Sequence, residues 1–402
     1  MFKNLDMKIL VISTMYPNKV LPVHAVFVRE RVKAISKRCE VKVVSPIPYF
    51  PGTGIVRHGK TRNSISNYEN QEGIDVFFPR FYSIPKILRP LDGISLFLSM
   101  YYLTNTTLKN YDFDLIDAHL AYPDGFGAIL LGKIFNKPIV VTVRGHDLNV
   151  FPSFPIRGKQ VSYTLRHASK IIAVAGALKQ KAIALGADRR KVEVIPNGVD
   201  LARFSTIDTL TARKRLNLPL YKKIILSVGH LVKRKGFQYI IESLNILLLR
   251  GVKNIHVVIV GGPGEEGDYS KELQDLIKSK GIEENITLVG PRNHHELPLW
   301  YNSADIFCLA SEKEGRPNVV LEAMACGLPV VATNVWGTKE LIPSEDYGLL
   351  VGNQKTELLA DAIQKAIEMQ WDRKKITSFA STWSWERNSL DVFSEFQKLV
   401  VK

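Results

Sequence analysis

Two glutamates, Glu314 and Glu322, stand in a segment that we expect to turn and then form a helix. Segment 311–333 follows an apolar run, places a Gly-Arg-Pro-Asn turn at 315–318, and reaches Gly327, which fits a helix end. The amides at a helix N-terminus carry the positive end of the helix dipole and suit a diphosphate. Glu322 lies about two turns beyond the start of this turn and can reach a ribose diol, while Glu314 can reach a hexose hydroxyl. The segment therefore predicts a site for a sugar joined to a nucleoside diphosphate.

Other polar residues follow apolar runs in the same way. Residues 229–236 form a basic loop directly after Val228, and Asp117-Ala118-His119 closes an earlier run. Segment 144–147, Arg-Gly-His-Asp, closes another. In doubly wound α/β folds, ligands bind beyond the carboxyl ends of the strands, so these positions are candidates for binding. The alternatives are a solvated basic turn at 229–236 and a structural histidine at 119.

The elements that must position these residues are short β-branched runs, and they alternate with amphipathic stretches. This alternation is typical of βαβ units around parallel sheets. A Pro-Asn-Gly turn at 196–198 divides the runs into two series, which predicts two domains. Segment 52–72 is polar and Gly-rich, and we expect it to form a long loop. The first series of predicted strands is 8–13, 41–45, 115–118, 139–143, 171–175 and 192–195, and the second is 223–228, 256–260, 287–289, 306–309 and 330–332.

The composition excludes several classes of protein. The chain has 402 residues, a hydrophobic content of 46% and charged residues at 23%, which fits a globular protein with two cores. The three cysteines are widely spaced and form neither a disulfide framework nor a zinc pattern. Asp112-Phe113-Asp114 resembles a metal-binding D-x-D, but it precedes a strand and lacks a third oxygen ligand, so we predict no metal. The N-terminal segment does not have the pattern of a signal peptide, and we expect a cytoplasmic protein.

The segment around Glu314 resembles the family-four retaining glycosyltransferases of the GT-B fold. The mark of this family is two glutamates separated by seven residues, and Glu314 and Glu322 fit it. Ala-Met-Ala-Cys-Gly at 323–327 and Pro-Val-Val-Ala-Thr at 329–333 are also typical of the family. The context makes the alternative of two solvated glutamates on an ordinary helix the weaker one. The resemblance extends over nearly the whole chain, more loosely in its first half.

The resemblance implies an α/β GT-B fold, with two facing Rossmann-like domains, a cleft between them and a C-terminal helix that returns to the first domain. The N-terminal domain would span residues 1–202, with 383–402 packing back on it, and would bind the acceptor. The C-terminal domain would span 203–382 and bind the nucleotide sugar. We expect segment 383–400 to present Trp383, Trp385, Phe393 and Phe396 as the apolar face of the returning helix.

The resemblance also implies roles for single residues. Lys235 matches the family lysine that neutralises the leaving diphosphate, whereas His230 stands where the family usually has arginine, so Arg234 or Arg316 would have to compensate. Ala25 stands where the family has glycine in its first loop. The catalytic residues would be His119, Lys235 and Glu314. The donor-binding residues would be His230, Lys235, Pro291, Gly315, Arg316, Asn318, Val319 and Glu322, and the acceptor-binding residues Arg144, His146 and Asp147.

The expected reaction transfers a sugar from a nucleotide-diphosphate-sugar donor to a saccharide or lipid-linked acceptor, without a metal or other cofactor. The base is left open between uridine and guanosine. The alternatives are a nucleotide-sugar epimerase of the same fold and a non-enzymatic protein that binds anionic lipid or polysaccharide. The net charge of +15 favours peripheral contact with an anionic membrane at its inner face, and the basic clusters lack the pattern of a nucleic-acid binder.

Overall fold

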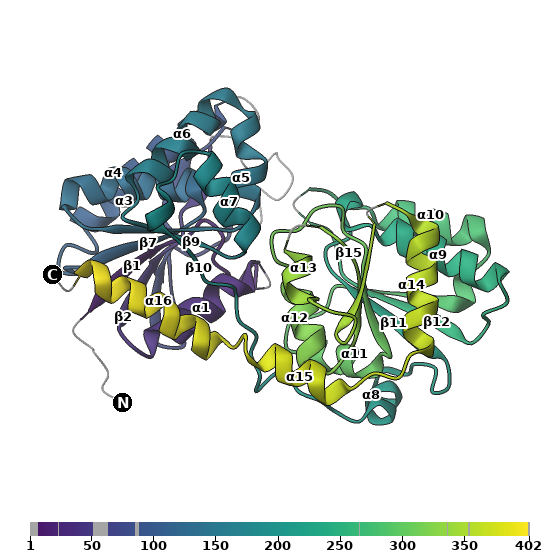
Figure 1. Ribbon diagram of the computed structural model, residues 1–402. Helices are drawn as coiled ribbons and strands as arrows, with labels where there is room; N and C mark the ends of the chain where they lie inside the picture. The colour runs from purple at the N-terminus through teal and green to yellow at the C-terminus, as the bar shows by residue number, and fades with distance from the viewer. Residues whose placement is uncertain are drawn as a thin grey trace. The chain divides into compact units, whose positions relative to one another are not determined.

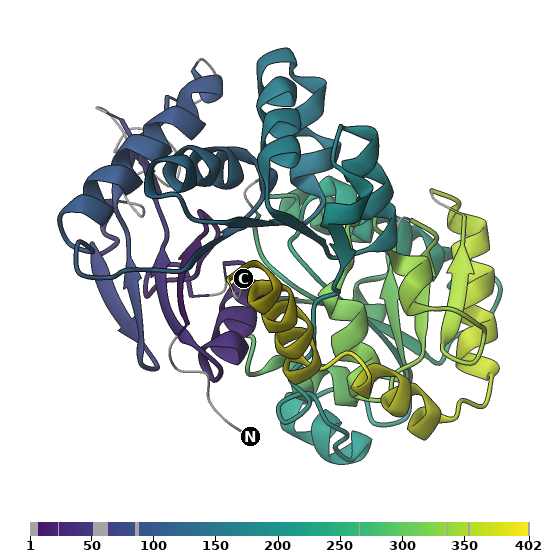
Figure 2. The ribbon, with the colours of Figure 1, turned by 60° about the vertical axis from the view of Figure 1, so that its left-hand side comes forward.

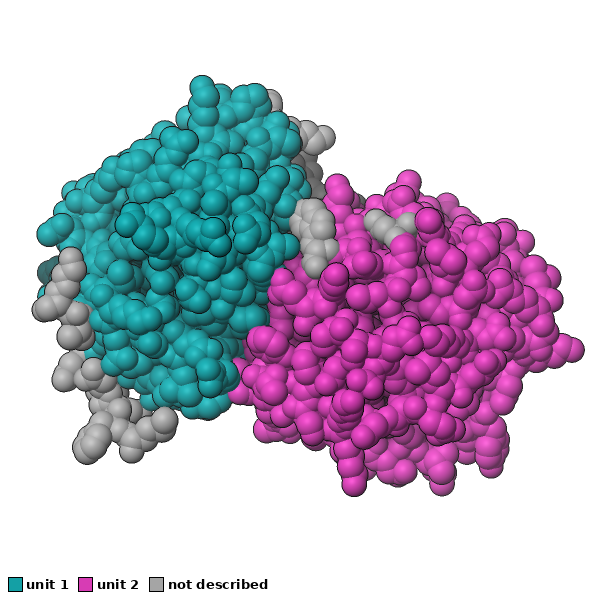
Figure 3. Space-filling model, viewed as in Figure 1, with its two compact units in different colours: residues 1–197, 385–402 teal, residues 198–384 magenta. Residues whose placement is uncertain are grey.

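The computed structural model describes residues 7–22, 24–50, 63–84, 88–264, 266–335, 337–352 and 354–400. The chain folds into two compact α/β units, which Figures 1 and 3 show. Unit 1 contains residues 1–197 and 385–402, and unit 2 contains residues 198–384. The boundaries expected from the sequence lie at 202 and 383.

Unit 1 is built on an eight-stranded sheet with the order β10-β9-β8-β7-β1-β2-β5-β4. Neighbouring strands are parallel except for β4 and β5. All six strands expected in this half are present, because strands buried on both faces are continuously apolar and easy to recognise. A separate pair, β3 (Ile47–Tyr49) and β6 (Arg80–Tyr82), lies beside it. The bounds are β1 (Lys8–Ile12), β2 (Glu40–Val44), β4 (Tyr68–Gln71), β5 (Ile74–Phe77), β7 (Leu115–His119), β8 (Ile139–Val143), β9 (Lys170–Ala173) and β10 (Val192–Val194).

Helices cover both faces of this sheet (Figures 1 and 2). Alternate residues of β1 show the two cores: Leu10 and Ile12 pack in one apolar cluster and Ile9 and Val11 in the other. Helices α3, α4 and α6 lie over the first face, and α1 and α16 over the second (Figure 1). The helices are α1 (Val26–Ser36), η2 (Arg89–Leu91), α3 (Asp92–Asn105), η3 (Ala121–Gly125), α4 (Phe126–Phe135), α5 (His146–Asn149), η4 (Phe151–Ser153), α6 (Pro155–His167), α7 (Gly176–Ala184), η5 (Arg189–Lys191) and α16 (Trp385–Val400).

The prediction of a long loop over residues 52–72 is wrong for its last part. Residues 68–71 form β4, which pairs with β5 as an antiparallel hairpin. The two turn residues, Glu72 and Gly73, have φ of 52° and 86°. Such a left-handed pair matches the twist of a two-residue hairpin, so a polar Glu-Gly that looks like loop sequence instead closes a strand pair. Residues 52–62 of the expected loop lie outside the described residues.

Unit 2 is built on a parallel six-stranded sheet with the order β13-β12-β11-β14-β15-β16. The five strands expected here are confirmed, and β16 extends the sheet beyond them. Helices pack on both faces, over two apolar clusters. The strands are β11 (Lys223–Val228), β12 (Ile255–Val260), β13 (Ile286–Gly290), β14 (Ile306–Leu309), β15 (Val330–Thr333) and β16 (Gly348–Val351). The helices are α8 (Thr209–Leu216), η6 (Lys233–Lys235), α9 (Phe237–Leu249), α10 (Ser270–Lys280), η7 (Glu283–Asn285), α11 (Leu297–Ser303), α12 (Asn318–Ala325), α13 (Thr338–Leu341), α14 (Thr356–Glu368) and α15 (Arg373–Ser381).

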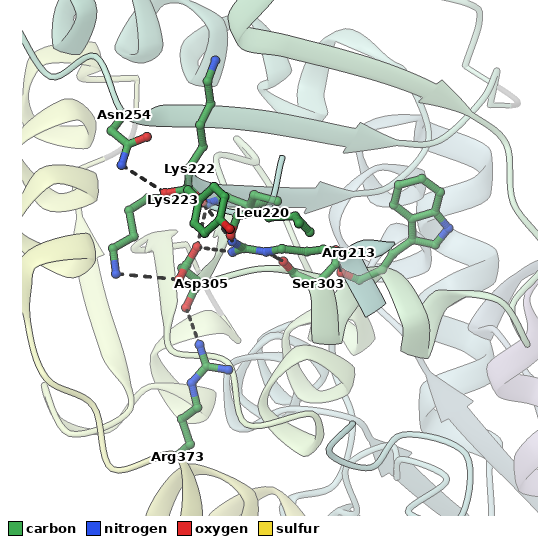
Figure 4. A network of polar contacts seen from close by, with 11 residues as sticks. Arg213, Leu220, Lys222, Lys223, Asn254, Ser303, Asp305 and Arg373 are labelled. Carbon is green, nitrogen blue, oxygen red and sulfur yellow. Dashed lines mark hydrogen bonds and ion pairs between the residues drawn. The ribbon is translucent and has the colours of Figure 1, made fainter. Parts of the chain in front are cut away.

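A buried arginine ties together the amino-terminal edge of this second sheet (Figure 4). Arg213 of α8 donates from Nε to the carbonyl of Ser303 at 2.8 Å, and from Nη1 to the carbonyls of Leu220 and Lys222 at 2.9 and 3.0 Å. Its Nη2 donates to Asp305 at 2.7 Å. Asp305 directly precedes β14, so one side chain connects a helix to the starts of two neighbouring strands. This fixes the edge of the sheet opposite to the one where ligands bind.

The C-terminal helix returns to unit 1 as expected. Phe396 of α16 is fully buried, and Glu395 forms an ion pair with Lys170 at 2.6 Å. The inclusion of Trp383 in this apolar face is wrong. The ring of Trp383 packs on Phe379 in unit 2, and its carbonyl accepts from the amide of Val199 at 2.8 Å. Trp383 therefore ends the last turn after α15, and the chain passes to unit 1 beyond it.

Candidate functional site

The loops after β11 and β14 lie side by side at the carboxyl edge of the sheet in unit 2. Strands β11 and β14 are neighbours, while β12 continues the sheet on the other side of β11. Such a point, where the strand order reverses, is where doubly wound folds bind ligands. The two loops also contact each other through their backbones, because the amide of Glu312 donates to the carbonyl of Arg234 at 2.8 Å. Gly236 has φ of 72°, and an added Cβ would lie 1.9 Å from the carbonyl oxygen of Ala310, so this approach requires glycine.

An ion pair joins the two loops. Nζ of Lys235 lies 2.6 Å from Oε1 of Glu314, and the side chains are only 14% and 10% exposed. Burial by itself would raise the pKa of the Glu314 carboxyl, but the charge and hydrogen bond of Lys235 outweigh this and hold the pKa below its usual value. The structure thus brings together two of the residues that the sequence proposed as catalytic, as an ionised pair.

Glu322 lies in α12 and both of its carboxylate oxygens are engaged. Oε2 accepts from the hydroxyl of Tyr301 at 2.9 Å, and Oε1 lies 3.0 Å from Nε2 of His294. The other ring nitrogen of His294 lies 2.9 Å from Nη1 of Arg203. Because a guanidinium can only donate, Nδ1 of His294 accepts a hydrogen bond from Arg203, and Nε2–H donates one to Glu322. The chain Arg203, His294, Glu322 and Tyr301 therefore holds this carboxylate in one orientation.

Four more of the residues predicted to bind the donor lie at or just before the N-terminus of α12. Gly315 lies in the turn, and Asn318 and Val319 form the first helical positions after Pro317. The first amides of a helix point away from its body, toward this turn. Arg316 is buried, with its guanidinium 4.7 Å from the ring centroid of Trp383.

Two other predicted residues lie on nearby loops of unit 2. His230 is exposed at the start of the loop after β11, and Pro291 is exposed after β13. Of the two arginines expected to compensate for His230, Arg234 forms an ion pair with Glu266 at 2.6 Å. The sequence did not indicate this pair, because Glu266 comes from the loop after the neighbouring strand β12.

In unit 1, His119 lies at the end of β7 and is completely buried. Its Nε2 lies 3.2 Å from Asp117 Oδ2, and its Nδ1 lies 2.7 Å from Arg144 Nη2. Arg144 also donates to Oδ1 of Asn197 at 3.1 Å. Since Arg144 can only donate, Nδ1 of His119 accepts and Nε2 donates to Asp117. Burial lowers the pKa of His119 to about 4, although Asp117 opposes the shift, so the ring is neutral at physiological pH.

Arg31 of α1 belongs to the same network, and its role was not predicted from the sequence. Its Nη1 donates to Thr142 Oγ1 at 2.8 Å, and its Nη2 lies 3.5 Å from Asp117. Burial would raise the pKa of Asp117, but Arg31 and His119 hold it below its usual value. No sequence signal singles out Arg31, because one arginine in an amphipathic helix usually faces solvent.

Asp147 and His146 are adjacent but have different surroundings. Asp147 is buried, and its carboxylate accepts from the amides of Ala121, Arg144 and Gly145 at 2.8, 3.1 and 2.9 Å. Asp147 thus shapes the loops after β7 and β8. His146 is exposed, with its ring 5.0 Å from that of Phe151.

The first loop of unit 1 contains two further features. Ala25 has φ of 43°, the left-handed conformation that glycine favours, at the position where the family has glycine. The amide of Thr14 donates to the buried carboxyl of Asp124 at 3.0 Å. Burial raises the pKa of Asp124 to about 8. No sequence signal singled out Asp124.

Comparison with known families identifies the chain. Residues 208–383 match the family model described as glycosyl transferases group 1, and residues 24–203 match the model described as glycosyltransferase family 4. A teichuronic acid biosynthesis glycosyltransferase described as putative, TuaC of Bacillus subtilis, is 30% identical over 367 residues, which cover 89% of each chain. The chain belongs to glycosyltransferase family 4. It is a glycosyltransferase, and the resemblance found in the sequence is confirmed.

Other relatives agree with this assignment. A D-inositol 3-phosphate glycosyltransferase of Arthrobacter sp. is 27% identical over 304 residues, covering 72% of this chain and 71% of the relative. Among solved structures, sucrose-phosphate synthase of Thermosynechococcus elongatus has a TM-score of 0.78 at 20% identity, covering 98% of this chain and 99% of that chain. HepE of Anabaena, solved in complex with UDP, has a TM-score of 0.74 at 21% identity, covering 98% and 100%. The glycosyltransferase has the GT-B fold.

No helix in the described part of this glycosyltransferase has both the length and the hydropathy that crossing a membrane requires.

Proposed function

We propose that this glycosyltransferase transfers a sugar, with retention of its anomeric configuration, from a nucleotide-diphosphate sugar to a saccharide or lipid-linked acceptor, without a metal ion. The Lys235–Glu314 ion pair, at 2.6 Å, carries the proposal. Both residues lie at the carboxyl edge of the sheet in unit 2, Lys235 in the loop after β11 and Glu314 in the loop that leads into α12. This arrangement offers a cation and a set of helix N-terminal amides at one place, which suits a diphosphate.

The leaving diphosphate gains negative charge as its bond to the sugar breaks. Lys235 and the amides of residues 315–319 stabilise this charge, and Glu314 keeps the ammonium of Lys235 in place. These groups supply the positive charge that a metal ion supplies in other sites. Glu322, oriented by His294 and Tyr301, binds the ribose. The complexes of HepE of Anabaena with UDP and with UDP-glucose support uridine as the base.

The acceptor binds to unit 1 in this proposal. Arg144 and the exposed His146 provide donors at the carboxyl ends of the strands, and Asp147 shapes their loop. His119 stays the predicted catalytic group of this unit, and its hydrogen bond at 2.7 Å supports a role in orienting Arg144. The teichuronic acid biosynthesis assigned to TuaC supports a growing saccharide as the acceptor. The net charge of +15 supports work at the inner face of an anionic membrane.

The test begins with a screen of nucleotide sugars by thermal shift. A ligand at about 100 times its Kd adds about 2.7 kcal/mol to the free energy of unfolding. With the donor that stabilises most, hydrolysis to free sugar serves as a reaction that needs no known acceptor. We expect Lys235→Ala and Glu314→Gln to lower kcat about 10²- to 10³-fold, because the first removes the cation that stabilises the leaving group and the second removes the carboxylate that holds this cation in place. EDTA should leave the rate unchanged. NMR of the free sugar, recorded before mutarotation mixes the anomers, should show the anomeric configuration of the donor.

Lys233→Ala is the matched control, because Lys233 belongs to the same basic loop and is exposed. It should keep the wild-type rate within about twofold, since an exposed charge is screened. If Lys233→Ala and Lys235→Ala lower the rate equally, the loop acts through its general positive charge, and the specific role assigned to Lys235 is wrong. A product of inverted configuration would overturn the proposed retention.

A further inference from the structure

Helix α3 of unit 1 has two apolar faces, and only one of them is buried. Leu96 and Met100 pack into the core, together with the small residues Gly93 and Thr104. On the opposite side Ile94, Leu98, Tyr101 and Tyr102 are 43%, 57%, 40% and 72% exposed. The one charged residue of the helix, Asp92, is buried. A helix on the surface of a globular unit normally presents charged and polar side chains to water, and α3 does not.

The apolar surface continues onto the neighbouring elements. Gln160 of α6 donates to the carbonyl of Pro90 in η2 at 2.8 Å, which brings the start of α6 beside the start of α3. The ring of Tyr101 lies 6.4 Å from that of Phe135, which brings the end of α4 beside the middle of α3. Figures 1 and 2 show these helices together on one face of the sheet. We call this the α3 surface; its exposed apolar residues are Leu91, Ile94, Leu98, Tyr101, Tyr102, Ile134, Phe154 and Ile156.

Basic side chains border the α3 surface. Lys133 precedes Ile134 on α4, Lys159 lies on α6, and both are exposed. The guanidinium of Arg157 lies 3.7 Å from the ring centroid of Phe154. Lys109 follows the end of α3 and is exposed. The exposed Asp112 lies nearby in sequence, but it is paired with Lys137 at 2.9 Å, so the border is positive.

We propose that the α3 surface binds the interface of a membrane that contains anionic lipids. The isoleucines and leucines of the α3 surface would enter the boundary between headgroups and acyl chains, and its tyrosines would lie at the depth of the headgroups. The lysines and the arginine at its border would pair with anionic headgroups. The net charge of +15 fits this partner. A second copy of the chain fits less well, because two α3 surfaces in contact would bring their basic borders together. This inference goes beyond the donor chemistry proposed above, since it concerns the place where the enzyme works.

The experiment measures flotation of the full-length protein with vesicles of phosphatidylcholine, either alone or mixed with phosphatidylglycerol. We expect wild type to bind the anionic vesicles at low salt and to bind neutral vesicles much less. The double variant Leu98→Asp/Tyr102→Asp should bind the anionic vesicles at least about tenfold more weakly, because two large side chains lose their burial in lipid. Leu98→Ser/Tyr102→Ser, which leaves the charge unchanged, should also weaken binding.

The matched control is Tyr221→Asp/Leu249→Asp in unit 2. These residues are 87% and 80% exposed and belong to unit 2, whereas the α3 surface belongs to unit 1, so this variant adds the same charge to the other unit. It should bind the anionic vesicles within about twofold of wild type if the membrane contacts only the α3 surface. Equal losses in the two aspartate variants would show that charge alone matters and would overturn the proposal.

Two further measurements separate the alternatives. The temperature of thermal unfolding and the rate of donor hydrolysis should be unchanged in Leu98→Asp/Tyr102→Asp. This result would show that the fold and the proposed donor site are intact in the variant, whether or not it binds lipid. Sedimentation should show the same mass for wild type and variant. A wild-type dimer that the variant dissociates, or wild-type protein that binds neither kind of vesicle, would overturn the membrane as the occupant of this surface.

Discussion

At the scale of single residues, His294 orients Glu322, the residue proposed to bind the ribose of the donor. Its Nδ1 accepts a hydrogen bond from Arg203 at 2.9 Å, which leaves the ring proton on Nε2. Nε2–H then donates to Glu322 at 3.0 Å. A hydrogen bond to a charged group contributes about 1.5–3 kcal/mol. We therefore expect His294→Ala to lower kcat/KM for the donor about 10- to 100-fold.

The conservative variant separates orientation from mere packing. His294→Gln retains an N–H donor and should recover part of the lost kcat/KM, whereas His295→Ala, at the exposed neighbouring position, should resemble wild type. Steady-state kinetics of donor hydrolysis check all three. If His294→Gln is as slow as His294→Ala while both unfold at the wild-type temperature, the hydrogen bond to Glu322 is not the reason for the loss.

Asp124 provides a second prediction at this scale. Burial raises its pKa to about 8 in the folded protein, and the nearby Asp147 adds to the shift. The unfolded chain releases this proton near pH 4, so the carboxyl contributes stability that is complete below pH 4 and is lost as the pH rises toward 8. Asp124→Asn removes the titration and keeps an oxygen acceptor for Thr14. The variant should gain stability over wild type between pH 5 and pH 8, by at most about 1.4 kcal/mol per pH unit.

Urea unfolding of wild type and Asp124→Asn at pH 5, 6.5 and 8 measures this difference. The comparison cancels the titration of all other groups, as long as the variant leaves them unchanged. Two stability profiles that run parallel over this range would show that Asp124 is ionised in the folded protein.

At the scale of elements, Arg213 holds α8 against the starts of β11 and β14 (Figure 4). Arg213→Met preserves the apolar stem and removes every donor, which leaves Asp305 and three carbonyls without this partner. Breaking a buried pair costs about 3–5 kcal/mol, and Asp305 is 22% exposed, so we expect the lower end of this range. Arg250→Met, which breaks the exposed pair with Asp361, should change stability by less than about 1 kcal/mol.

Both variants are measured by urea unfolding followed by circular dichroism. Equal effects of Arg213→Met and Arg250→Met would mean that the network at the edge of the sheet adds little to the stability of unit 2. A loss confined to Arg213→Met would show that the amino-terminal edge is fixed by this one side chain.

At the scale of the whole molecule, the residues proposed to bind the donor all belong to unit 2. Hydrogen exchange should therefore respond unequally to UDP. We expect slower exchange in residues 229–236 and 312–322, where the loops close around the diphosphate, and little change in strands β1 and β7 of unit 1. Mass spectrometry of peptides with and without UDP checks this. Protection that appears mainly in unit 1 would show that the nucleotide binds unit 1 and would contradict the proposed donor site.

Much of the fold could be predicted from the sequence because parallel strands covered on both faces must be apolar along their whole length. The strands 139–143, 223–228 and 306–309 were predicted to the residue. The hairpin of β4 and β5 could not be predicted in this way, since a polar strand ending in Glu72-Gly73 has the composition of a loop. Trp383 was assigned to the wrong unit because an aromatic spacing fits either of two adjoining helices.

The sequence by itself determined the family, the two-unit α/β fold and the placement of Glu314, Lys235 and Glu322 on loops and a helix start, because motif spacing and strand periodicity are local properties of the chain. Only the tertiary structure decided which side chains meet. Arg203 and His294 lie on loops outside helix α12, which carries Glu322, yet Arg203 contacts His294 and His294 contacts Glu322. Arg31 of α1 contacts Asp117 of β7, although strands β2 to β6 and helix α3 lie between them in the chain. It also decided that one face of α3 stays exposed, because an apolar helix has the same composition whether the core covers one side of it or both.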